Sequence, residues 1–156
     1  MQRLQRLMLV NALLVILASM LAGFMLGFAV IGGLEIYPGK ILAMPYYGTA
    51  DGWVRAHTGG VLNGLLIIAF ALALPLIPLS DKMQQLTAGS FIFIGWANTA
   101  FYWFGNAAGS RALSFGDNRL GASNIMGMIG YGAALIGAIL IVGLLLFLVI
   151  KLLAHE

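Results

Sequence analysis

Long runs of apolar residues dominate the chain, and each run is long enough to cross a bilayer as one helix. About 20 consecutive apolar residues span the hydrocarbon core in helical form. A helix also satisfies its backbone hydrogen bonds internally, which lipid cannot do. The pattern therefore predicts an all-α membrane protein, a four-transmembrane-helix bundle with one integral membrane domain over residues 1–156. The predicted spans are residues 7–31, 56–79, 86–104 and 125–150.

The polar segments between the runs set the predicted topology. An even number of spans places both termini and the short turn at residues 80–85 on one face, so the two longer loops, residues 32–55 and 105–124, share the other face. Lysine and arginine are divided equally between the two faces, so the positive-inside rule gives only a weak indication of the membrane orientation. Arg3 and Arg6 flank the first span directly and favour cytoplasmic termini.

Composition excludes several function classes. The chain is 62% hydrophobic and only 8% charged, whereas soluble domains are about 25% charged. The formal net charge is +3, but the eight lysines and arginines form no basic block, so we expect no nucleic-acid partner. Cysteine is absent, which excludes disulfides, iron–sulfur clusters and thiolate-ligated haem.

Small residues recur at spacings that favour close helix packing. Gly23 and Gly27 form one G-x-x-x-G pattern, and Gly60 and Gly64 form another. Helices in lipid associate through such residues because they allow the backbones to approach closely. We expect these glycines to line contacts within the bundle or between copies of it.

Polar residues inside the predicted spans mark a candidate functional interior, because burying them in lipid is costly. His57 stands at the mouth of the second span, and Asn63 lies six residues deeper. In the third span Asn98, Tyr102 and Asn106 recur every four residues, which places them in one stripe on a helix.

Depth along the helices relates these two groups. At about 1.5 Å per residue, Asn63 lies roughly 9 Å inward of His57, and Asn98 roughly 6 Å inward of Tyr102. If the second and third spans are antiparallel neighbours, His57, Asn63, Asn98 and Tyr102 converge on a cavity near the longer loops. The sequence permits this arrangement without requiring it.

His57 has two interpretations. It is either an interfacial histidine that hydrogen-bonds a loop carbonyl or an axial haem ligand. The other histidine, His155, lies beyond the far end of the fourth span, about 30 Å across the bilayer. One chain therefore offers at most one histidine to a haem, which argues against a bis-histidine electron carrier and for an iron with an open or weakly held sixth position.

Other aromatic and charged residues also have alternative roles. Trp96 and Trp103 suit an interfacial aromatic belt, whereas Tyr102 shares its stripe with asparagines and is predicted to point its phenol into a cavity. Glu35 and Arg111 are solvated loop charges, partners of each other, or groups that hold haem propionates.

Four motifs carry a resemblance to the styrene oxide isomerase family, small membrane enzymes of bacteria. They are GGLEIYPG at residues 32–39, GWVRAHTGGVLNG at 52–64, GWANTAFYWFGN at 95–106 and SRALSFGDNRLG at 110–121. The chain departs from the family pattern at Ile94, where an acidic residue often precedes the GWAN motif, and at residues 110–113, where SRAL replaces NRGL.

The resemblance implies a multi-pass homotrimer in the bacterial inner membrane that binds haem b near its subunit interfaces. It implies that His57 is the axial ligand of ferric iron and that Asn63 and Tyr102 assist catalysis. We add Asn98 to the catalytic set, and Arg111 and Trp53 to the cofactor-binding set. The implied reaction is a Meinwald rearrangement of a hydrophobic aryl epoxide to an aldehyde, with the iron as Lewis acid.

Two other hypotheses remain open at this point. A b-type haem electron carrier or haem sensor on the same scaffold needs a second axial ligand, for which Met44, Met126 and Met128 are candidates. A haem-free membrane interaction or transport protein needs neither ligand.

Overall fold

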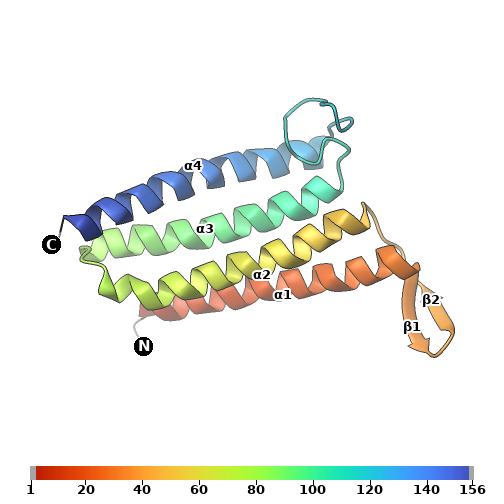
Figure 1. The fold of residues 1–156 in the computed structure, drawn as a ribbon, viewed down its shortest axis with the longest axis horizontal. Helices are drawn as coiled ribbons and strands as arrows, with labels where there is room; N and C mark the ends of the chain where they lie inside the picture. The colour runs from red at the N-terminus through yellow and green to blue at the C-terminus, as the bar shows by residue number, and fades with distance from the viewer. Residues whose placement is uncertain (1–2, 155–156) are drawn as a thin grey trace.

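The computed structural model describes residues 3–154, and four long helices account for most of them (Figure 1). Both ends of the chain lie at one end of the bundle, while the two longer connections lie at the other, as predicted (Figure 1). The predicted position of His155 falls outside the described residues. The helices and strands are α1 (Arg3–Ile31), β1 (Gly33–Tyr37), β2 (Lys40–Ala43), α2 (Ala50–Ala73), η1 (Leu74–Leu76), α3 (Asp81–Asn106) and α4 (Ile125–Leu153).

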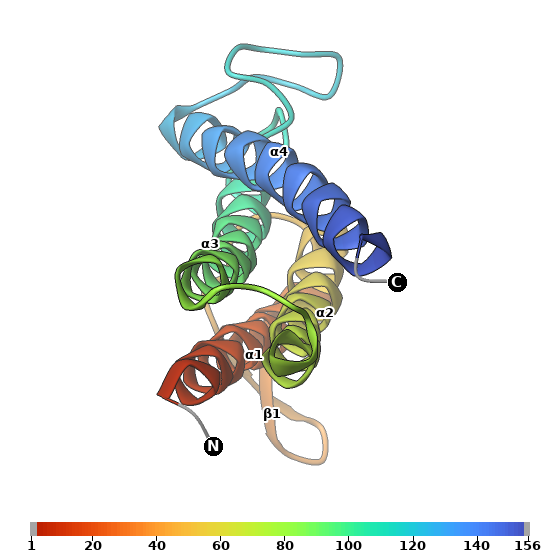
Figure 2. The same ribbon diagram turned by 90° about the vertical axis from the view of Figure 1, so that its left-hand side faces the viewer.

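Three of the helical segments are long and apolar enough to cross a membrane: α1, α2 continued by η1, and α4. The prediction of membrane spans is therefore supported for three of the four runs. Helix α3 is less apolar because it starts with charged and amide side chains and carries further polar residues along its length. Two of these, Thr87 and Thr99, are buried inside the protein, where α3 lies between α2 and α4 (Figure 2).

The predicted boundaries of the second span were shifted toward the C-terminus. Helix α2 begins at Ala50 because Thr49 caps it: the Thr49 hydroxyl accepts a hydrogen bond from the Gly52 amide, which satisfies one of the free donors of the first turn. The helix gives way to η1 at Leu74, where Pro75 lacks the amide hydrogen needed to continue the ladder. Arg55 therefore lies within the helix rather than in the preceding loop.

The all-α prediction was wrong for residues 33–43, which form an antiparallel hairpin of β1 and β2. The turn contains Gly39 with a φ of +81°, a conformation that glycine adopts without steric cost. Glu35 stabilises it, since its carboxylate accepts a hydrogen bond from the Gly39 amide at 2.7 Å. The hairpin projects away from the helices (Figure 1).

Close packing of α1 on α2 explains one of the predicted glycine patterns. A Cβ atom at Gly60 would lie 2.8 Å from the Cβ of Ser19, and one at Gly64 would clash with Ile16. Glycine at both positions lets the two backbones approach, as expected for helices in lipid. The same contact continues toward the loop end of α1, where Gly23 faces His57.

Two buried clusters hold the bundle together. The larger one joins all four long helices near the end that holds the termini, through residues such as Met8, Ile67, Phe91 and Leu148. The smaller one surrounds Trp53 near the longer loops. Helix α4 packs on α3 (Figure 2) and buries few of its own side chains, so most of its apolar surface is exposed in the single chain.

Candidate functional site

A pair of asparagine side chains, Asn63 and Asn98, links α2 to α3. Asn98 donates a side-chain hydrogen bond to the amide oxygen of Asn63 at 2.9 Å, and Asn63 in turn donates to the carbonyl oxygen of Gly59 at 2.8 Å. Asn63 is only 8% exposed. Because each bond uses a specific amide atom, the pair fixes which way the Asn63 amide faces.

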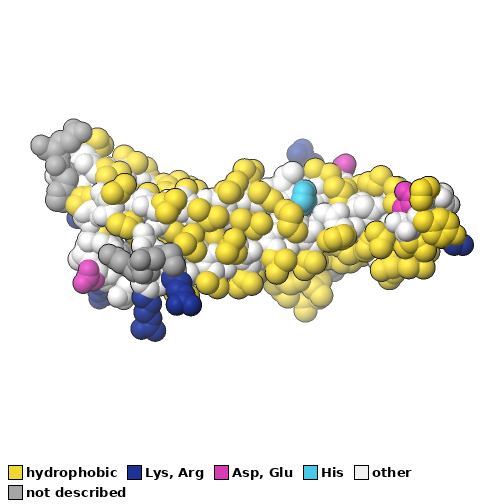
Figure 3. All heavy atoms as spheres, turned by 90° about the horizontal axis from the view of Figure 1, so that it is seen from below, with side chains coloured by type: hydrophobic (Ala, Val, Ile, Leu, Met, Phe, Trp, Pro, Cys, Tyr) yellow, Lys and Arg dark blue, Asp and Glu magenta, His cyan; other side chains and the backbone are white. Residues whose placement is uncertain are grey.

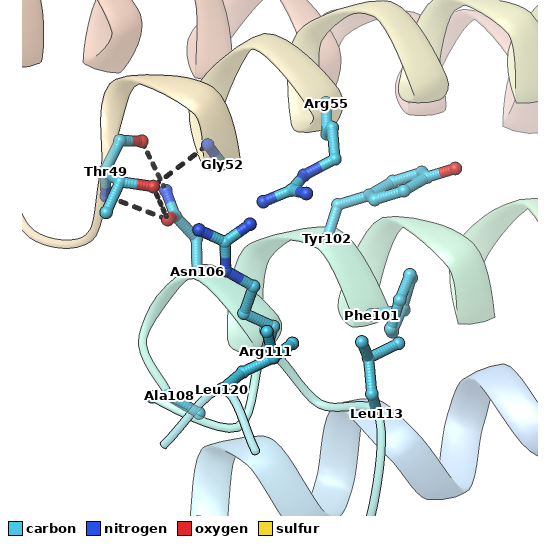
Figure 4. A pocket seen from close by; sticks show the side chains of 12 residues that line it. Thr49, Gly52, Arg55, Phe101, Tyr102, Asn106, Ala108, Arg111, Leu113 and Leu120 are labelled. Carbon is cyan, nitrogen blue, oxygen red and sulfur yellow. Dashed lines mark hydrogen bonds between the residues drawn. The ribbon is translucent and has the colours of Figure 1, made fainter. Parts of the chain in front are cut away.

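Tyr102 lies one helical turn from Asn98, and its ring packs against the backbone of α2 at Gly59. A Cβ atom at Gly59 would lie 2.5 Å from the Tyr102 ring, so only glycine leaves room for the phenol there. The Tyr102 hydroxyl has no hydrogen-bond partner within residues 3–154, and in Figure 4 it points away from Thr49 along the course of α2. The phenol is therefore a donor that the described protein leaves free.

Asn106, the third residue of the predicted stripe, has a structural role. Its side-chain oxygen accepts from the Thr49 amide at 2.9 Å, and its side-chain nitrogen donates to the Thr49 carbonyl oxygen at 3.3 Å (Figure 4). These bonds fasten the end of α3 to the start of α2. Of the three residues in the stripe, Asn106 therefore joins two helix ends, whereas the deeper Asn98 and Tyr102 are the functional candidates.

His57 lies on a different side of α2 from the amide pair. Its Nδ1 donates to the carbonyl oxygen of Ser19 on α1 at 2.9 Å, and the Ser19 hydroxyl donates back to the His57 carbonyl oxygen. The expected convergence holds for Asn63, Asn98 and Tyr102 along α2 and α3, but His57 faces α1 instead. The reason is helical phase: six residues separate His57 from Asn63, which at about 100° each turns the two side chains to different faces.

The surface around His57 is apolar. His57 is the one histidine among residues 3–154 and is partly exposed, and Figure 3 shows that hydrophobic side chains cover much of this face of the protein. The interfacial interpretation predicts a hydrogen bond to a loop carbonyl. The carbonyl that His57 binds belongs instead to helix α1. Nε2 makes no hydrogen bond to the described residues, so its lone pair is available to a ligand.

Trp53 anchors the connection between the hairpin and α2. It is fully buried, and its indole nitrogen donates to the carbonyl oxygen of Tyr47 at 2.8 Å. Its ring meets those of Tyr47 and Trp103 edge-on. Burial also raises the pKa of the Tyr47 phenol. Trp53 exposes no surface to a cofactor within one chain, and its predicted cofactor role stays a prediction.

The two tryptophans predicted to form an interfacial belt differ. Trp103 is half-buried against Trp53 and belongs to the smaller cluster, and its place in a belt stays a prediction. Trp96 is partly exposed, and its indole nitrogen donates to the side chain of Asn11 on α1 at 3.0 Å.

A pocket of about 450 Å³ opens between α2, the end of α3 and the following loop (Figure 4). The guanidinium groups of Arg55 and Arg111 both reach it, and no acidic residue lines it. Arg111 has a φ of +55°, in the left-handed region that few residues with a side chain adopt. The remaining lining residues are Thr49, Gly52, Phe101, Tyr102, Gly105, Asn106, Ala108, Gly109, Leu113 and Leu120.

The pairing of Glu35 with Arg111, one of the predicted alternatives, is not formed. Glu35 is on the hairpin and binds its own turn, whereas Arg111 is on the loop across the bundle (Figures 1 and 2). Two of the proposed methionine ligands are also separated from His57: Met126 and Met128 lie on α4, across the bundle from α1 (Figure 2). Met44 follows β2 directly.

Three residues of this region had no predicted role in the site, although Gly23 was expected at a helix contact. Ser19 and Gly23 contact His57 from α1, and Arg55 shares the pocket with Arg111. Ser19 is the one hydroxyl side chain in the apolar run of residues 7–31, a signal that would have indicated a partner on a neighbouring helix.

Fold and site together define a helical membrane protein with an amide pair and a free phenol between two helices. The styrene oxide isomerase family model matches residues 4–153. The styrene-oxide isomerase of Pseudomonas fluorescens is 38% identical over 141 residues, which cover 90% of this chain and 83% of that protein. The chain belongs to the styrene oxide isomerase family and is an isomerase.

Proposed function

We propose that this isomerase converts an aryl epoxide of the styrene oxide type into an aldehyde by a Meinwald rearrangement. The benzylic C–O bond breaks, a hydride migrates from the terminal carbon to the benzylic carbon, and the remaining C–O bond becomes a carbonyl. No electrons leave the substrate and no cosubstrate is consumed. The observation that carries the proposal is the family match along nearly the whole chain, combined with two donors between α2 and α3, the Tyr102 hydroxyl and one Asn63 amide hydrogen, that make no hydrogen bond to the described residues.

The surroundings of His57 fit a b-type haem. Nδ1 is bound to a carbonyl, as is usual for a metal-ligating histidine, while Nε2 makes no hydrogen bond to the described residues, and much of this face of the protein is apolar (Figure 3). When bound, ferric haem b would supply a Lewis acid for the epoxide oxygen. Arg111 would hold a propionate, since a guanidinium pairs well with a carboxylate.

The chain's own donors have separate tasks in this proposal. The Tyr102 hydroxyl donates a hydrogen bond to the oxygen of the epoxide as negative charge develops on it. Asn63 offers its second amide hydrogen, because the first is bound to Gly59 and its oxygen is held by Asn98. A site that excludes water would keep the benzylic cation from being trapped as a diol.

We extend the proposal to a homotrimer of four-span subunits in the bacterial inner membrane, with α3 as the fourth span. The open apolar surface of α4 supports contact with further copies. His57 points from α2 toward α1, whereas Tyr102 of α3 packs against a different side of α2 at Gly59. This separation supports an assembly in which neighbouring subunits complete each other's site.

The test uses purified protein and styrene oxide carrying two deuterium atoms on its terminal carbon. The expected product is phenylacetaldehyde with one deuterium at the benzylic carbon and one on the aldehyde, detected by mass spectrometry and NMR. A diol product, or recovery of the epoxide from protein with a full complement of haem, contradicts the proposed reaction. The matched control is the Tyr102→Phe variant, which keeps the ring and loses the donor.

A further inference from the structure

Helix α1 holds His57 through two reciprocal hydrogen bonds. The Ser19 carbonyl accepts from His57 Nδ1 at 2.9 Å, and the Ser19 hydroxyl donates to the His57 carbonyl oxygen. Ser19 is only 1% exposed, so these bonds lie away from water. They fix both the backbone and the ring of His57 against the same residue.

The direction of the ring bond settles where the histidine proton lies. A carbonyl oxygen only accepts hydrogen bonds, so Nδ1 must carry a proton. In the neutral imidazole the lone pair is then on Nε2. A hydrogen bond from the non-ligating nitrogen to a carbonyl also fixes the ring orientation and raises the basicity of the ligating nitrogen.

Two glycines make this contact possible. A Cβ atom at Gly23 would lie 3.0 Å from His57 Nδ1 and 3.2 Å from Cε1, so glycine gives the ring its space. A Cβ atom at Gly60 would lie 2.8 Å from the Cβ of Ser19, so glycine there brings α1 close to α2. Gly27, one turn beyond Gly23, has no atom within 4 Å of an added Cβ.

We propose that Ser19 and Gly23 are positioning residues for a metal ligand, and that they present His57 Nε2 to the iron of the cofactor. This inference rests on the proposed function. It assigns to α1, whose sequence contains no histidine, the control of iron–histidine bonding.

The test compares Gly23→Ala with Gly27→Ala in the purified, haem-loaded protein. The iron–histidine stretching band of the ferrous form is measured by resonance Raman spectroscopy, and haem retention by transfer to apomyoglobin. In Gly23→Ala the added methyl displaces the ring and weakens its bond to Ser19, so we expect a lower stretching frequency and about tenfold weaker haem retention. Gly27→Ala is expected to match the wild type.

Ser19→Ala provides a second variant that keeps the packing. It removes the hydroxyl bond to the His57 carbonyl, and a smaller shift of the band in the same direction is expected. Wild-type band position and haem retention in both Gly23→Ala and Ser19→Ala would overturn the inference. A wild-type protein without haem, or one whose haem persists in His57→Ala, would instead contradict the proposed cofactor site.

Discussion

The side-chain amide nitrogen of Asn98 lies 2.9 Å from the side-chain amide oxygen of Asn63, and this hydrogen bond joins α3 to α2. A bond between two neutral amides is directional, so each side chain determines the orientation of the other. The relationship makes Asn98 a support for Asn63 and leads to the first prediction.

Replacing Asn98 with Ala is expected to lower the turnover number for styrene oxide while haem content stays unchanged, because Asn63 loses the bond that orients it. The lost interhelical bond should cost about 0.6 to 2 kcal/mol of stability. Turnover and thermal unfolding in detergent provide the measurements. Asn11→Ala is the control, since it removes another amide that joins α1 to α3; an equal loss of turnover in that variant would argue against an orienting role.

Tyr102→Phe is expected to leave stability within about 0.5 kcal/mol of the wild type, because the hydroxyl has no partner within residues 3–154. Turnover should fall about 100-fold, the order seen when a donor to a developing oxyanion is removed. Steady-state kinetics and thermal unfolding separate the two effects. A variant that loses stability but keeps its turnover would show that the phenol is structural.

Gly59→Ala tests whether the position of the Tyr102 ring controls the reaction. The added Cβ would lie 2.5 Å from the Tyr102 ring, so the ring must move and turnover should fall. Gly89→Ala in α3 is the matched control, because an added Cβ there meets no atom within 4 Å. If the two alanine variants have the same turnover, the position of the Tyr102 ring does not control the reaction.

His57→Ala is expected to abolish haem binding, since residues 3–154 contain no second histidine to replace the ligand. Absorption spectra of the purified protein, before and after dithionite, provide the measurement. Thr58→Ala serves as the control, as the Thr58 hydroxyl binds the carbonyl of Val54 within its own helix. A haem band of wild-type intensity in His57→Ala would exclude this ligand.

Trp53→Ala is expected to destabilise the protein by about 3 to 5 kcal/mol, the usual cost of removing a large buried aromatic side chain. Trp96→Ala should cost less, because Trp96 is 38% exposed whereas Trp53 is fully buried. Thermal unfolding with full haem loading tests both. Should Trp53→Ala unfold like the wild type yet lose its haem, the indole would be a cofactor contact rather than a core residue.

The sequence predicted the relation between Asn63 and Asn98 because depth in a membrane helix follows directly from residue number. It did not predict the direction of His57, since the run of residues 7–31 has almost no polar pattern to show which face of α1 meets α2. The hairpin was missed for a different reason: its two strands are short and mostly exposed, so they lack the alternation of buried and exposed residues that marks a strand.

Gly59 makes the location of Tyr102 depend on the distance between two helices rather than on a side-chain lock. Helices in a bilayer tilt when the thickness of the hydrocarbon layer changes, and a change in tilt between α2 and α3 would move the Tyr102 phenol relative to Gly59. We therefore expect the donor geometry of this isomerase to respond to the lipid around it. Its turnover should vary with the acyl-chain length of the bilayer even when the cofactor and the epoxide concentration are held constant.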